Sequence, residues 1–161
     1  MIARNLAGGL LGLSLLLVPV PAAAQRGGGN SSPQLNLTVS PLSISFASAN
    51  PDVSPLIAAA PIVVLVRVRQ NTGPWTLTIV ANGDLLSGGS AVDISNVTWI
   101  ATPAPPFRGG TLSKTVAQTM ASGTGNVNPP QNGSVTFRLA NSWTYSAGNY
   151  TQTVVFTLSA P

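Results

Sequence analysis

From Leu35 to its C-terminus, the chain is a succession of short alternating or β-branched runs that Pro, Gly, Asn and Asp residues separate. In this part, no segment of about ten residues free of Gly and Pro carries a helical apolar stripe. The pattern predicts an all-β fold in which two antiparallel sheets pack as a sandwich, immunoglobulin-like in the broad sense. The predicted strands are 35–39, 42–46, 62–69, 75–81, 94–101, 111–119, 134–139 and 150–159.

Alternation within these strands predicts which faces are buried, because successive side chains of a strand point to opposite sides of the sheet. In strand 62–69 the even-numbered residues form an apolar row. We expect strands 62–69 and 75–81 to form a hairpin, since Asn71-Thr72-Gly73-Pro74 contains the residues that a chain reversal needs. The Pro- and Gly-rich segments 102–110 and 121–133 are predicted to be loops.

Residues 1–24 have the pattern of a secretory signal peptide. Arg4 precedes an apolar run from Leu6 to Val18, and the small residues 22–24 form a cleavage site before Gln25. The apolar run is short for a membrane-spanning helix of about 20 residues, and no later segment is long enough. We therefore expect a secreted protein with a flexible leader at 25–34, which is mostly Gly, Ser and Asn, and a folded domain at 35–161.

The chain contains no histidine, cysteine or glutamate, and its acids are Asp52, Asp84 and Asp93. General acid–base catalysis needs an imidazole or carboxylates with separated pKa values, and nucleophilic catalysis needs a base beside Ser or Cys. Zinc needs thiolate or imidazole ligands. The sequence thus predicts a protein that is not an enzyme and holds no metal or cofactor. Its cations are few and scattered, which argues against nucleic-acid binding.

Four side chains are candidates for surface contacts. Phe107 and Arg108 are expected at the tip of the Pro-rich loop 102–110. Trp143 and Tyr145 lie near asparagines, and aromatic faces with amide side chains suit the stacking of a sugar ring. The alternative is that these two aromatics pack at a strand end.

Two segments carry a more specific pattern. Trp75-Thr76-Leu77 is a W-x-L tripeptide, and residues 150–161 read YTQTVVFTLSAP. Together they resemble the WxL domain of bacterial cell-wall proteins, whose C-terminal segment has the form Y-x-x-x-L-T-W-x-L-x-x-x-P. The residues that match its Tyr, Leu, Trp, Leu and Pro are Tyr150, Val154, Phe156, Leu158 and Pro161, with Val155 in place of the Thr and one residue missing before the proline.

The resemblance implies non-covalent attachment to peptidoglycan and display of surface proteins. The alternative is that Trp75 and Phe156 are core aromatics of a secreted sandwich, as in fimbrial subunits. Both interpretations predict that Trp75, Leu77, Phe156 and Leu158 are buried.

Two function hypotheses follow for this secreted, non-catalytic chain. In the first, it is a bacterial surface protein that associates with the cell wall or with other envelope proteins. In the second, it is a subunit of an extracellular filament or coat assembled by strand exchange, because 35–39 alternates like a strand that could complete a neighbour's sheet. Charged residues make up 6% of the chain, so its surface would not oppose such self-assembly.

Overall fold

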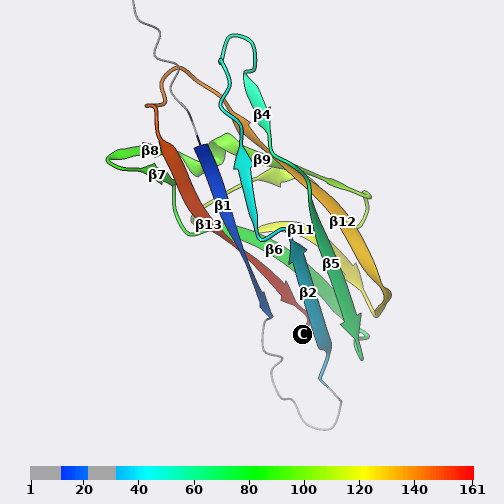
Figure 1. The fold of residues 1–161 in the computed structure, drawn as a ribbon. Helices are drawn as coiled ribbons and strands as arrows, with labels where there is room; N and C mark the ends of the chain where they lie inside the picture. The colour runs from blue at the N-terminus through cyan, green and yellow to red at the C-terminus, as the bar shows by residue number, and fades with distance from the viewer. Residues whose placement is uncertain (1–11, 22–31) are drawn as a thin grey trace, which may run out of the picture.

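The computed structural model describes residues 12–21 and 32–161, and within them it is an all-β sandwich of two packed sheets (Figure 1). This confirms the predicted fold class, while its immunoglobulin-like character stays a prediction. A 3-10 turn, η1 (Ile94–Asn96), interrupts the described strands. No helix in the described residues is long and apolar enough to cross a membrane.

The first sheet, sheet A, has seven strands, and five of them form a continuous path in the order β11-β6-β13-β1-β3. Their bounds are β11 (Gln118–Thr124), β6 (Pro74–Ala81), β13 (Asn149–Ser159), β1 (Gly12–Pro21) and β3 (Ser43–Phe46). The short strands β7 (Leu85–Ser87) and β8 (Ser90–Val92) extend sheet A beside the start of β13.

The second sheet, sheet B, has six strands in the order β10-β9-β12-β5-β2, with β4 paired to β12. Their bounds are β10 (Gly110–Thr111), β9 (Val97–Thr102), β12 (Val127–Ala140), β5 (Ile62–Arg69), β2 (Gln34–Ser40) and β4 (Leu56–Ala58). Strand β2 is an edge strand, which pairs along its whole length with β5.

The core lies between the sheets and follows the predicted alternation. The apolar row of β5, residues 62, 64, 66 and 68, is completely buried. The largest fully buried side chains are Trp99, Tyr150, Phe107, Phe137 and Phe156. Since a buried large apolar side chain contributes about 1.5–3 kcal/mol, this row and these aromatics account for why a chain without cysteine can fold.

The predicted hairpin between 62–69 and 75–81 is wrong, because β5 belongs to sheet B and β6 to sheet A. The connection crosses between the sheets, and the buried Asn71 holds it: its side-chain amide donates to the Gly73 carbonyl at 2.9 Å and its oxygen accepts from the Gly73 N–H at 3.1 Å. The positive φ that the crossing needs, 55°, is at Gln70 rather than at a glycine.

The predicted loop 121–133 is also wrong, since β11 and β12 cover most of it. Its polar residues pair through their backbones while many of their side chains face solvent, and register shifts interrupt both strands. Conversely, the predicted strand 111–119 is mostly a turn, in which the Ser113 hydroxyl accepts from the N–H groups of Thr115 and Val116.

One strand pair departs from the predicted antiparallel sandwich. All pairs of the described strands are antiparallel except β1 with β13, which run parallel in register from Gly12 opposite Asn149 to Pro21 opposite Leu158. Figure 1 shows the blue β1 lying alongside the orange-red β13. The parallel strand is therefore supplied by the segment whose sequence predicts an export signal.

Candidate functional site

Strand β1 fills a gap in sheet A between β13 and β3, and we call this gap the β3–β13 slot. On one side β1 is parallel to β13 over its whole length. On the other side it is antiparallel to β3, with Leu15 opposite Ile44 and Leu16 opposite Ser43. An additional bond of 2.8 Å joins the Leu17 N–H to the Leu42 carbonyl. The slot is thus a two-sided backbone site for one extended strand.

The slot takes alternate side chains into the core. Leu15 and Leu17 are 0% and 2% exposed, whereas Leu16 between them is 53% exposed. Leu17 is the register partner of the buried Val154, and Leu15 faces Ile44 across the sheet. Burial of two leucine side chains contributes about 3–6 kcal/mol, before the backbone hydrogen bonds are counted. An empty slot would therefore expose an apolar groove and two unpaired strand edges.

A small apolar cavity lies in the core near one end of the slot. It has a volume of about 10 Å³ and is lined in part by Phe46, Leu85 and Tyr150. This volume is about that of one water probe, so the cavity does not hold a substrate-sized molecule. Phe46 and Tyr150 are both register partners of Leu13 in β1. The cavity therefore lies beside the start of β1.

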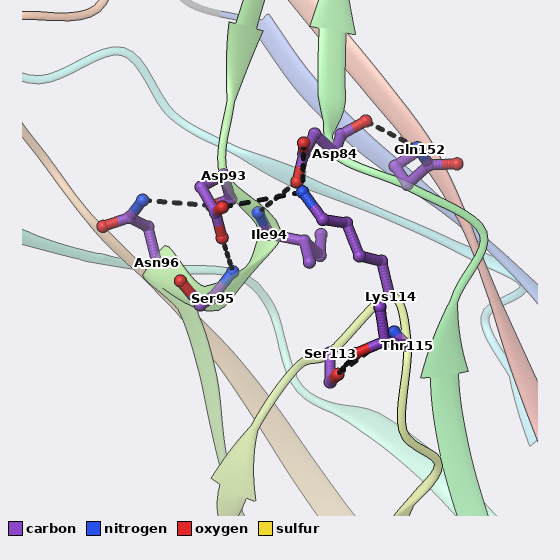
Figure 2. Close-up of polar contacts among 9 residues, drawn as sticks. All are labelled: Asp84, Asp93, Ile94, Ser95, Asn96, Ser113, Lys114, Thr115 and Gln152. Carbon is purple, nitrogen blue, oxygen red and sulfur yellow. Dashed lines mark hydrogen bonds and ion pairs between the residues drawn. The ribbon is translucent and has the colours of Figure 1, made fainter.

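An ion-pair cluster lies near the edge of β13 that pairs with β6 and β7, opposite the edge that pairs with β1 (Figure 2). The Lys114 ammonium donates to Asp84 Oδ2 at 2.6 Å and lies 3.6 Å from Asp93 Oδ2. The other Asp84 oxygen accepts from the Ile94 N–H at 3.1 Å, and the Asp84 carbonyl accepts from the Gln152 amide of β13. The cluster ties the turn after β10 to η1 and β13, so its geometry explains a structural role.

The contacts in this cluster favour the charged forms of Asp93 and Lys114. Hydrogen bonds from Ser95 hold the pKa of the Asp93 carboxyl below its ordinary value, and Lys114 adds to this effect. The hydrogen bond to Asp84 raises the pKa of the Lys114 ammonium. No group of His, Cys, Asp or Glu residues that could hold a metal ion occurs in the described residues.

Of the four predicted contact residues, Arg108 and Trp143 are exposed, whereas Phe107 is buried and Tyr145 is half-buried. Phe107 is not a surface residue: it is 1% exposed, because Gly133 of β12 leaves room for its ring under the Pro-rich loop. Arg108 beside it is exposed. Trp143 is 61% exposed, and its indole N–H donates to Asp52 at 2.9 Å. Tyr145 is half-buried and donates to the Ala140 carbonyl, and burial raises its pKa.

The residues of the W-x-L pattern lie in sheet A. The expected burial of Trp75, Leu77, Phe156 and Leu158 is confirmed. Tyr150 and Val154 are buried as well, and Pro161 at the chain end is exposed. Leu77 and Leu158 are opposite one another in the β6–β13 pair, so the two segments of the pattern meet inside the core.

No family model matches this chain, and no curated protein is detectably similar to it in sequence. The resemblance to the WxL domain therefore rests on the residues quoted above.

Leu15 and Leu17 are the site residues that the sequence interpretation misses. A short continuous apolar run fits a buried strand as well as other apolar segments, and periodicity alone does not separate them. The features that indicate a strand are the valines and prolines at its end, 18–21, because Val favours strands and Pro disfavours helix continuation.

Proposed function

We propose that the processed chain is a non-catalytic structural subunit of an extracellular filament or coat, which assembles by strand exchange. The observation that supports this function is the source of β1. If the export segment is removed, the β3–β13 slot loses its strand, and sheet A acquires two facing edges above an apolar groove. Such edges bind extended segments of other chains by β-augmentation.

The donor strand that fits best is β2 of a second copy of this chain. Among the edge strands of the described residues, β2 is the one with three alternating apolar residues, Leu35, Leu37 and Val39. In its own sheet, Leu35 and Leu37 are half-buried, so less apolar contact is lost when β2 leaves than for a central strand. Their spacing matches that of Leu15 and Leu17 in the slot.

Sedimentation and electron microscopy of residues 25–161 test this function. Concentrated protein is expected to form oligomers or filaments, and an excess of the peptide QLNLTVS, residues 34–40, should cap the slot and shorten them. The same peptide with Leu37→Asp is the matched control, because a carboxylate cannot enter the apolar groove without a large cost. Only monomers at high concentration would refute the function.

Association with the cell wall is the second candidate function, and the exposed Trp143 ring favours it. An exposed indole ring suits stacking against a sugar. Retention of residues 25–161 on purified peptidoglycan, lost in Trp143→Ala, is the expected result. Equal retention of the variant would remove Trp143 from that role.

A further inference from the structure

We propose that the export segment is itself the first occupant of the β3–β13 slot, so that the unprocessed chain completes its own sandwich and its processing creates the strand-binding site. This inference rests on the proposed function, since it names what occupies the same slot before assembly. It also defines the chemistry of the segment that the slot binds.

The direction of β1 is the first argument. A segment that continued from β13 through a tight turn would return antiparallel to it, whereas a parallel partner needs a long connection or a separate chain. Strand β1 satisfies this condition because nearly the whole described chain lies between β1 and β13. The slot therefore fits a strand that is distant from β13 in the sequence, as β1 is.

The register is the second argument. Leu15 and Leu17 point into the core, and Leu16 points to solvent beside Leu86 and Thr151 in a shallow groove on the outer face. A shift by one residue would bury Leu16 and expose both of its neighbours, because side chains alternate with a period of two. The slot thus selects apolar side chains at positions 15 and 17, whereas a polar side chain fits at position 16.

The composition of the leader is the third argument. After cleavage before Gln25, the new N-terminus reads QRGGGNSSP and has no aliphatic or aromatic side chain. This segment cannot replace Leu15 and Leu17 in the groove. Processing therefore opens the slot without providing an occupant from the same leader, and an edge strand such as β2 of a second copy can take its place.

Engineered cysteines test the placement of β1 in the full chain, which has no cysteine of its own. Leu16 and Ser43 are directly opposite in the antiparallel β1–β3 pair, so Leu16→Cys with Ser43→Cys is expected to form a disulfide. Leu16→Cys with Ser45→Cys is the matched control, because Ser45 is exposed and two residues out of register. Circular dichroism of the reduced proteins is the control that checks whether both variants fold.

The expected result is rapid disulfide formation in the first variant of residues 1–161 and at least tenfold slower formation in the control. Equal rates in two folded variants would overturn the inference.

Peptide binding tests which side chains of β1 enter the slot. The peptide GLSLLLVPVP, residues 12–21 with a terminal lysine tag, is expected to raise the thermal midpoint of residues 25–161. Its Leu16→Asp variant should retain this effect, and its Leu15→Asp variant should lose it. Equal effects of the two variants would overturn the proposed register.

These outcomes separate the inference from the proposed function. A disulfide and peptide binding in a chain that stays monomeric after processing would support the inference and refute assembly. Assembly of residues 25–161 without a register-specific disulfide in the full chain would support the proposed function and refute the inference.

Discussion

Replacement of Leu15 by Ala in the full, unprocessed chain measures how much β1 contributes to the fold. Leu15 is 0% exposed and lies opposite Ile44, whereas Leu16 is 53% exposed. Truncation of a fully buried leucine costs about 2–5 kcal/mol through lost burial and the cavity left behind. Truncation of an exposed leucine usually changes stability by less than about 0.5 kcal/mol. Leu15→Ala and Leu16→Ala therefore differ only in the face of β1 that they alter.

Urea denaturation of the two variants, followed by tryptophan fluorescence, gives the free energies of unfolding. The decrease in the free energy of unfolding that Leu15→Ala causes has an upper limit. It cannot exceed the free energy with which β1 docks in the slot. Once β1 leaves the sheet, further damage to it has no effect, so Leu15→Ala with Leu17→Ala should cost less than the sum of the single variants. Equal stability of Leu15→Ala and Leu16→Ala would refute the reasoning.

Two other predictions concern packing and pH. Gly133→Ala would place a methyl group 2.6 Å from the Phe107 ring and is expected to cost about 1–3 kcal/mol, whereas Gly89→Ala, with open space around it, should cost far less by the same urea assay. Equal costs would contradict the packing of Phe107. The urea midpoint should be flat from about pH 5 to pH 9, because the chain has no His, Cys or Glu. Because the folded pKa of Asp93 is lowered, its contribution is present above its ordinary value of 3.8 and lost as pH falls through the folded pKa. Because the folded pKa of Lys114 is raised, its contribution is present below 10.5 and lost as pH rises through the folded pKa. A midpoint that shifts between pH 5 and pH 9 would contradict this account.

The sequence predicts the fold class and the core well, because both depend on local alternation. The buried rows of β5 and β6 and the apolar face of β13 are the even or odd positions that the pattern indicates. Where alternation is absent the prediction is wrong, as in 121–133. There, backbone pairing with neighbours distant in sequence forms strands from residues of low strand propensity.

Strand partners are harder to predict than strands. The turn residues at 71–74 fit a hairpin and a crossing between sheets equally well, and only packing decides between them. The same limit applies to β1, since its valines and prolines at 18–21 favour a strand but do not indicate which strands it pairs with. The sequence therefore contains both leucines of the candidate site but does not show that β3 and β13 flank them.

Hydrogen exchange at the amides of β13 tests the strand-acceptor account most directly. In the full chain, the β13 amides that face β1 should be protected, and in freshly processed monomer the same amides should exchange rapidly while those that face β6 stay protected. Assembly or the addition of the β1 peptide should restore protection. Full protection of β13 in the processed monomer would contradict the account, because it would mean that the sandwich closes without an added strand.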